Sequence, residues 1–483
     1  MIVKEVKNGV VTVKAIKYSA IQSTRGGQFV KRKKPVKGVS SLLLIALSGV
    51  IVSGCGTTNA TSTNGSGQSK ANASGSFDKG PLTITMWVNP PAVSVVQKIN
   101  SEFEQKYGVK VNLETAANDA AGYTTLQQTS VQAGTADIMA IQPFDPMPQK
   151  MTSNNLSTIQ EWAVHNVFMP LNGEPWFSQF NNSDLSAAAY NGKDYGLVTG
   201  VYQTGLFYNK TIFQRYNLTV PTTYNQFVTV CKTLKSHNIT PVWTGIANGA
   251  SFYLEFMMYP FMQDALASSL GSASASQALA SGQVKWTDAN MVKAFTREKE
   301  FASNYLEKNY AGENWQQMPG AFAAGKAAML LDGSWDIPSV LQANPSMQIG
   351  YFPIPGSNTS ANNNSVSNPD LTWTILNNSK HKALAEKWLA FFASSSIYNQ
   401  YVKATGISPS ESGTFSSTTG SVMGDWFGKG RVINQTADWI IPSGPFYMQS
   451  NNFWSEQLRM LQGSISPTEL AQQYQKSQNQ ASS

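Results

Sequence analysis

Charged side chains are scarce in this sequence of 483 residues, where Asp, Glu, Lys and Arg together make up only 13%. That is about half the usual share of roughly 25%. The chain also has only two cysteines and three histidines. Each histidine (His165, His237 and His381) is isolated in the sequence, with no second ligand at the spacing that metal sites use. We therefore expect neither a metal nor any other cofactor.

The formal net charge of +7 suggests a nucleic-acid partner, but its distribution argues against one. Residues 1–55 hold ten basic side chains and a single acidic one, Glu5. The remaining chain holds 25 basic and 27 acidic residues, so it is close to neutral. A nearly neutral body has no basic face with which to neutralise phosphates. Binding to nucleic acid is not expected.

The N-terminal 55 residues have the order of a secretory signal. Basic residues 31–34 precede an apolar run over residues 39–52, and Gly54-Cys55 follows. This run is too short to be a spanning helix. Val52-Ser53-Gly54-Cys55 resembles a bacterial lipobox, with Val52 where Leu is usual, so Cys55 is the expected lipidation site. An uncleaved anchor is the alternative, and both interpretations place the remaining chain outside the cytoplasm.

Two further segments have a simple interpretation. Residues 1–29 have no role in a signal peptide, and we hypothesise that translation begins near Val30. Residues 56–80 are rich in Gly, Ser, Thr, Asn and Ala, which predicts a flexible linker. The other cysteine, Cys231, follows an apolar stretch and is expected to be a buried small residue without a disulfide partner.

The globular part begins with an alternation of strands and helices. Residues 82–88 alternate at period two, which predicts a strand, and residues 109–113 and 136–141 are the next two strands. Apolar residues at helical spacing lie between them, for example around residues 123–131. Strand–helix–strand repetition is typical of a parallel sheet flanked by helices. Ligands of such sheets bind beyond the carboxyl ends of the strands.

Six motifs follow one another along the chain. They are Ala136–Ile138, Asn191–Leu197, Leu206–Phe213 with Pro221–Phe227, Phe322–Trp335, Pro353–Gly356 and Lys382–Phe392. In order and spacing they resemble the motifs of the family 1 extracellular solute-binding proteins, the group of the maltose- and multiple-sugar-binding receptors, and the resemblance extends from Leu82 to Ala471. The fourth motif, FAAGKAAMLLDGSW, is the most specific, whereas Val198 replaces a usual Pro and Tyr224-Asn225 replaces a usual Trp-Asp/Glu pair.

The resemblance implies an α/β, two-lobe periplasmic-binding-protein-like fold of type II. Each lobe is expected to hold a mixed, mainly parallel sheet flanked by helices, with the ligand cleft between the lobes. The expected division is residues 1–55 extension and signal peptide, 56–80 linker, 81–198 plus 369–406 lobe 1, and 199–368 plus 407–483 lobe 2. Hinge crossings are expected near Leu197–Gly200, Pro355–Pro369 and Thr405–Pro409.

The implied function is that of the extracytoplasmic substrate-binding subunit of an ABC importer. Such a subunit binds a carbohydrate, here expected to be an oligosaccharide, by hinge closure and delivers it to the transmembrane permease subunits. The protein is expected to be a monomer on the outer face of the cytoplasmic membrane, held only by its lipid anchor, and not to be an enzyme. The alternatives are a non-sugar solute in the same fold, or a secreted glycoside hydrolase, which would need a pair of carboxylates. The acids Asp145, Glu255, Asp332 and Asp336 are not paired by any motif.

A sugar site needs aromatic platforms for C–H faces and polar side chains for hydroxyls. The first candidate is Trp335, where Gly333 turns a buried strand and Ser334 is predicted to cap a helix that begins at the tryptophan. Asp145 follows the third predicted strand, where the family often uses Asp to bind hydroxyls. The further candidates for ligand binding are Trp87, Trp243, Asp332, Gln203, Tyr202, Trp373 and Trp439.

The low charge density suggests one more hypothesis, that the protein works in an acidic exterior. At low pH carboxylates become protonated, and a highly charged protein would then repel itself as a polycation. An amide- and hydroxyl-rich surface avoids this repulsion.

Overall fold

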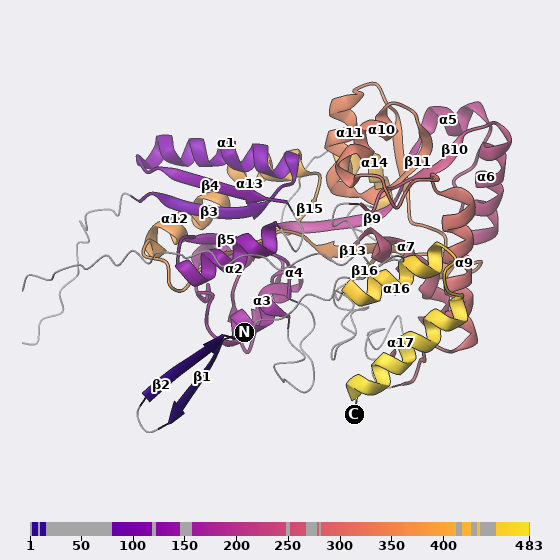
Figure 1. The fold of residues 1–483 in the computed structure, drawn as a ribbon. Coiled ribbons are helices and arrows are strands. Elements are labelled where there is room, and N and C mark those ends of the chain that lie inside the picture. Colours follow the sequence, from indigo (N-terminus) through magenta and orange to yellow (C-terminus); the bar gives the residue numbers. More distant parts are fainter. Residues whose placement is uncertain are drawn as a thin grey trace, which may run out of the picture. The chain divides into compact units, whose positions relative to one another are not determined.

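The computed structural model describes residues 2–7, 10–15, 80–117, 122–144, 157–247, 252–266, 278–279, 282–411, 418–426, 432–434 and 451–482 (Figure 1). The chain divides into two units, Met1–Ser74 and Gly75–Ser483. In the first unit, β1 (Ile2–Lys7) and β2 (Val10–Ala15) pair as an antiparallel hairpin. Cys55 and the predicted linker up to residue 79 lie outside the described residues.

The first sheet of the second unit has five strands in the order β4-β3-β5-β14-β8. Its strands are β3 (Leu82–Trp87), β4 (Val111–Ala116), β5 (Ile138–Ile141), β8 (Leu197–Val198) and β14 (Thr372–Ile375). β3 pairs in parallel with β4 and β5, as the strand–helix alternation predicts, whereas β14 is antiparallel to β5 and β8. β4 begins two residues later than predicted. β3 and β5 are buried on both faces because helices cover the sheet, which is typical of parallel sheets.

The second sheet has seven strands, with β10-β11-β9-β13-β16 in order and β12 and β15 also pairing with β9. Its strands are β9 (Gly200–Asn209), β10 (Thr240–Trp243), β11 (Ala327–Gly333), β12 (Ile349–Phe352), β13 (Ser365–Pro369), β15 (Ser408–Pro409) and β16 (Val432–Asn434). The expectation of a mainly parallel sheet does not hold here. β9 is antiparallel to all four of its neighbours, and only β10–β11 and β13–β16 are parallel. β9 enters this sheet directly from β8 of the first sheet, whereas β11 and β12 each follow a helix. These two strands run in the direction opposite to β9.

The chain passes between the two sheets at three places. β8 ends at Val198 and β9 begins at Gly200, β13 ends at Pro369 and β14 begins at Thr372, and helix α13 (Ser395–Thr405) leads into β15. These passages lie in or at the end of the three ranges where hinge crossings are expected. That they act as hinges, and that the lobes divide at the expected residues, stay predictions.

The helices pack on the sheets in two groups. With the first sheet lie α1 (Pro90–Tyr107), α2 (Tyr123–Ala133), α12 (Lys382–Phe392) and α13. Figure 1 shows α1 and α13 beside the β3–β4 end of that sheet. The predicted packing face of the helix at residues 382–392 is confirmed, because Trp388 and Phe392 are fully buried and the indole of Trp388 donates to Asn100 Oδ1 at 2.9 Å. Shorter elements are α3 (Thr158–Val164), α4 (Asn182–Leu185), β6 (Ala189–Tyr190) and β7 (Lys193–Asp194).

A second, larger core surrounds the other sheet. Its helices are α5 (Lys210–Arg215), α6 (Tyr224–Ser236), α7 (Tyr253–Leu266), α9 (Ala289–Tyr305), α10 (Met318–Ala323), α11 (Ile337–Ala343), α14 (Thr418–Met423), α16 (Asn451–Leu461) and α17 (Pro467–Ser482). In Figure 1, α16 and α17 lie next to α9. Cys231 is buried in α6, as predicted, and burial raises the pKa of its thiol.

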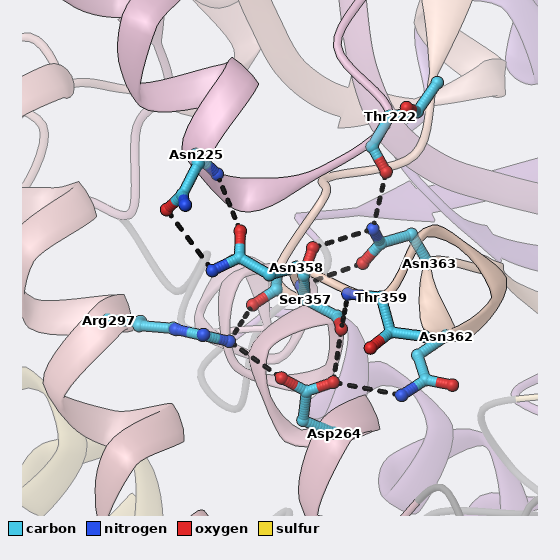
Figure 2. Close-up of polar contacts among 10 residues, drawn as sticks. Thr222, Asn225, Asp264, Arg297, Ser357, Asn358, Thr359, Asn362 and Asn363 are labelled. Atoms are coloured by element: carbon cyan, nitrogen blue, oxygen red, sulfur yellow. Dashed lines mark hydrogen bonds and ion pairs between the residues drawn. The ribbon is translucent and has the colours of Figure 1, made fainter.

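An ion pair between the buried Arg297 and the half-buried Asp264 ties the loop after β12 to two helices (Figure 2). Asp264 of α7 accepts from Arg297 of α9 at 2.9 Å and from Asn362 at 3.0 Å, and Ser357 also donates to it. Arg297 in turn donates to the Gly356 carbonyl at 2.7 Å. Burial alone would raise the pKa of Asp264, but these hydrogen bonds and the guanidinium lower it. This carboxylate is therefore stabilised in its charged form.

The carboxyl of Glu298 on α9 is fully buried and has no cationic partner among the described residues. Gln457 of α16 donates to its Oε1, while Oε2 has no hydrogen-bond partner. Burial raises the pKa of Glu298 to about 8. The group therefore stays protonated in the folded protein at neutral pH, because an unpaired charge in this core would be costly.

We expect Glu298 to make the folded protein less stable as pH rises. Its pKa is higher in the folded than in the unfolded chain, so its contribution to stability is complete below about pH 4.5 and is lost as pH rises towards about 8. Relative to the wild type, Glu298→Gln should gain on the order of 2–3 kcal/mol of unfolding free energy between pH 5 and pH 8. Urea unfolding at the two pH values measures this difference.

Glu456→Gln is the control, because Glu456 pairs with Arg459 on the surface of the neighbouring helix α16. Its effect should stay below about 0.5 kcal/mol at both pH values. Equal pH dependence in the wild type and Glu298→Gln would contradict the prediction.

Candidate functional site

Trp335 lies immediately after the fully buried strand β11, in a short 3-10 turn, η4 (Ser334–Asp336), that leads into α11. The predicted capping role of Ser334 is wrong, because Ser334 belongs to this turn and its hydroxyl accepts the backbone N–H of Gln203 at 3.3 Å. The indole of Trp335 folds back over Gly333, where a Cβ atom would overlap its six-membered ring. Trp335 is 8% exposed, so only a small part of the ring reaches the surface.

The indole belongs to a row of aromatic side chains. Tyr202 of β9 meets Trp335 edge to face, with ring centroids 4.9 Å apart. The ring centroid of Phe256 of α7 lies 5.8 Å from that of Trp335, within the same hydrophobic core. Phe252 lies 5.8 Å from Phe256, and Trp315, in the turn η3 (Trp315–Gln317), lies 6.2 Å from Phe252. We call these five residues the aromatic row. Tyr202, Phe252 and Trp315 are half-buried, so the row has both packed and accessible rings.

Polar groups gather around the hydroxyl of Tyr202. Asn368, its partner on β13, donates to the Tyr202 oxygen at 3.1 Å. Burial raises the pKa of Tyr202 well above its usual value, and the nearby carboxyls of Glu255 and Asp370 raise it further. Burial also raises the pKa of Asp370 to about 6. An amide, a phenol and two carboxyls thus lie at one end of the aromatic row, where they can meet hydroxyl groups of a ligand.

Two buried carboxyls lie behind the indole. Asp336 Oδ2 accepts the indole N–H of Trp335 at 3.2 Å. Asp332, at the end of β11, accepts the Tyr253 hydroxyl and the Gly333 N–H, each at 2.7 Å, with the same oxygen. Burial and the neighbouring Asp336 raise the pKa of Asp332 well above its usual range, and burial raises that of Asp336. Asp332 is fully buried, so it supports the row rather than forming part of its surface.

The structure places the predicted site residues in three different settings. Trp335, Tyr202, Asp332 and Gln203 lie together, and Gln203 is buried, with its amide donating to Ser365 and to the Trp426 carbonyl. Trp87 and Trp373 lie in the core of the first sheet. Trp87 packs edge to face on Tyr123 at 5.6 Å, and the fully buried Trp373 packs on Trp388 at 5.3 Å.

Trp243 is half-buried at the end of β10, and its ring lies under the ammonium group of Lys326, at 5.4 Å, rather than in the aromatic row. Asp145 and Trp439 lie outside the described residues.

Among the described residues, no group of His, Cys, Asp and Glu could hold a metal ion. No helix in the part of the chain that the structure describes is long and apolar enough to cross a membrane.

The sequence interpretation missed Phe252, Phe256, Trp315 and Asn368. Phe252 immediately precedes α7, Phe256 lies in its first turn, and Trp315 begins η3, and none of the three belongs to one of the recognised motifs. Asn368 could have been found from the pairing of β13 with β9, since cross-strand partners on one face lie close together. That pairing joins residues 166 positions apart, and no local pattern indicates it.

A two-sheet α/β body with a polar–aromatic surface at one sheet is the form of a solute-binding protein. The chain belongs to the family of bacterial extracellular solute-binding proteins, which matches residues 89–397. It is thus an extracytoplasmic solute-binding protein of the kind that serves ABC importers, as the motifs predict, and its fold is the type II fold of this class.

Several relatives support this assignment. The multiple sugar-binding protein of Streptococcus mutans serotype c is 26% identical over 322 residues, which cover 65% of this chain and 71% of that protein. The structure of RafE, a solute-binding protein in complex with raffinose, superposes with a TM-score of 0.67 at 20% identity and covers 83% of this chain and 100% of that one. A sugar transporter protein from Bacillus licheniformis in complex with stachyose gives a TM-score of 0.64 at 16% identity, covering 83% and 99%.

We expect Gly333→Ala to displace the indole of Trp335, because the added methyl group would occupy the space of its ring. Overpacking of this kind costs typically about 1–3 kcal/mol of unfolding free energy. Thermal unfolding and tryptophan fluorescence measure the two effects. Gly320→Ala is the matched control, since a Cβ at this position in α10 meets nothing within 4 Å. It should be neutral or stabilising by up to about 1 kcal/mol, and equal destabilisation by both variants would contradict the prediction.

Proposed function

We propose that the solute is a carbohydrate, in particular an oligosaccharide, and that the aromatic row binds it. The observation that carries this proposal is the combination of half-buried rings with an amide, a phenol and two carboxyls at one end of the row. Rings provide platforms for the apolar C–H faces of a sugar, and polar groups select its hydroxyls. The row continues from Tyr202 through the buried Trp335 and Phe256 to Phe252 and Trp315, and its three half-buried rings are more platforms than one sugar ring needs. The sugar-binding relatives support the same ligand class.

The proposed mechanism is a shift of population between an open and a closed arrangement of the two lobes about the three chain passages. A ligand that contacts both lobes favours the closed arrangement, which the ABC permease then recognises. Moving the balance from 1:99 to 99:1 needs a preference of about 10⁴-fold for the closed state. Stacked rings and charge-assisted hydrogen bonds supply differences of this size.

The proposal includes no enzymatic activity. A glycosidase needs two accessible carboxyls about 5–9.5 Å apart, one as acid and one as base or nucleophile. Asp332 and Asp336 lie beside each other, but they are buried behind the indole, so they cannot meet a glycosidic bond from this position. The protein is proposed to act as a monomer that releases its ligand unchanged.

We expect the purified protein to show a higher melting temperature with oligosaccharides of the raffinose or maltose type, because a ligand that binds only the folded state stabilises it by mass action. Spermidine and a neutral peptide are the controls for a non-sugar solute. Trp335→Ala should weaken the affinity, measured by calorimetry, by at least about tenfold. Tyr216→Ala should keep it within about twofold, because Tyr216 stacks on His237 away from the aromatic row.

A rise in melting temperature with spermidine or the peptide, and with no sugar, would leave the fold assignment unchanged and contradict the carbohydrate proposal. Equal losses in Trp335→Ala and Tyr216→Ala would remove Trp335 from the site. Chromatography of the incubated sugar checks the absence of catalysis, and shorter products would contradict it.

We also propose that Cys55 carries the lipid that holds the protein at the outer face of the cytoplasmic membrane. Cys55→Ser should release the protein from the membrane fraction into the medium, as measured by fractionation and immunoblotting. Cys231→Ala is the matched control and should remain membrane-bound, because Cys231 lies buried in α6. A Cys55→Ser protein that stays in the membrane at unchanged mass would instead support an uncleaved anchor.

A further inference from the structure

The carboxyls of Asp332 and Asp336 form a buried pair. Neither reaches the surface, so neither contacts the solute in the proposed site. Asp332 is 0% exposed and Asp336 is 5% exposed. The oxygen Oδ1 of Asp332 accepts two hydrogen bonds, from Tyr253 and from the Gly333 N–H, whereas Oδ2 has no donor partner. The carboxyl that acts on Asp332 electrostatically is that of Asp336.

The described elements that pack most extensively around this pair carry no basic side chain to balance it. The elements packed against β11 and η4 are β9, β10, α7, α10 and α11, and α14 packs on α11. None of these six elements contains a Lys, Arg or His. Tyr253 of α7 donates to Asp332. The other titratable groups that these elements contain are Tyr202, Tyr208, Glu255, Tyr259 and Asp264. Two buried carboxyls in such surroundings cannot both be ionised, so at least one of them carries a proton over a wide pH range.

Asp336 also holds the aromatic platform. Its Oδ2 accepts the indole N–H of Trp335, the Tyr253 hydroxyl also acts on this indole, and the ring plane is set by its close approach to Gly333. The position of the indole therefore depends in part on where the Asp336 carboxyl lies. If both carboxyls were ionised, two negative charges would repel each other in a site of low polarity, and η4 would have to move.

We propose that Asp336 is a positioning residue for Trp335, and that protonation of the buried Asp332–Asp336 pair makes solute binding stronger in acid than at neutral pH. The second part rests on the proposed function, because it requires that Trp335 contacts the solute. A bound solute removes further water from this region and so favours the protonated pair. Affinity is then highest while the pair is protonated, and falls by up to about tenfold per pH unit where the proton is lost.

The first test needs no ligand. In the full-length protein labelled with ¹⁵N-tryptophan, the indole N–H resonance of Trp335 is assigned by its loss in Trp335→Phe. We expect this resonance to shift along a titration curve between pH 4 and pH 9 in the wild type. Asp336→Asn keeps an oxygen acceptor for the indole but cannot ionise, so the shift should disappear. Asp332→Asn leaves one carboxyl, and the titration should move to lower pH.

The second test measures the affinity for the oligosaccharide that gives the largest thermal shift, at pH 5 and pH 8. Wild-type binding should be at least about tenfold tighter at pH 5, and Asp336→Asn should bind equally, within about twofold, at both values. Asp336→Ala should bind more weakly at both, because the indole loses its acceptor. Glu298→Gln is the matched control, since it removes another buried carboxyl of the same core and should keep the wild-type pH dependence of binding.

The two tests separate this proposal from the proposed function. An indole resonance that does not move with pH, or moves equally in wild type and Asp336→Asn, overturns the proposal whatever the solute is. Should Asp336→Asn fail to fold, the wild-type titration and its displacement in Asp332→Asn decide the same question. A titrating indole together with no carbohydrate binding at any pH would support the positioning role and overturn the carbohydrate.

Discussion

The second sheet depends on one strand, β9, whose backbone groups are paired along its length by four other strands. A buried strand must satisfy its N–H and C=O groups, and β9 does so with β11 and β12 towards one end and with β13 and β15 towards the other. Tyr202 and Gln203 lie where these two sets of neighbours meet. The site therefore forms only when segments from residues 200 to 409 are all in register on this one strand.

The strand register on β9 also explains which side chains meet at the site. Tyr202 meets Asn368 because these residues are paired across β9 and β13. Gly333 is paired with Thr204 at the end of β11, which brings the η4 turn and the indole of Trp335 next to Tyr202. Because side chains alternate between the two faces of a strand, a shift of one residue would turn each of these groups to the opposite face.

The scarcity of charge has a counterpart inside the protein. Asp264 has a guanidinium partner and a lowered pKa, whereas Glu298, Asp332, Asp336 and Asp370 have raised pKa values because burial dominates. Carboxyls of the second kind are stabilising while protonated, and their contribution is lost as pH rises. These four carboxyls contribute more to stability in acid than at neutral pH, whereas acid would weaken the ion pair of Asp264. That the protein works in an acidic exterior stays a hypothesis.

The sequence by itself determined the local elements, the family and the class of function. β3, β5 and α12 follow from periodicity, because a strand or helix buries a face that repeats at a short, fixed interval, and the GSW motif led to Trp335. Tertiary structure alone decided which rings each of these buried tryptophans meets. Trp87, Trp335 and Trp373 all stand near strand ends in the sequence, yet Trp87 and Trp373 pack against Tyr123 and Trp388 in the core. It also decided the antiparallel course of β9 and the meeting of Trp335 with Phe256, Phe252 and Trp315, because these depend on contacts between residues far apart in the chain, which no local pattern encodes.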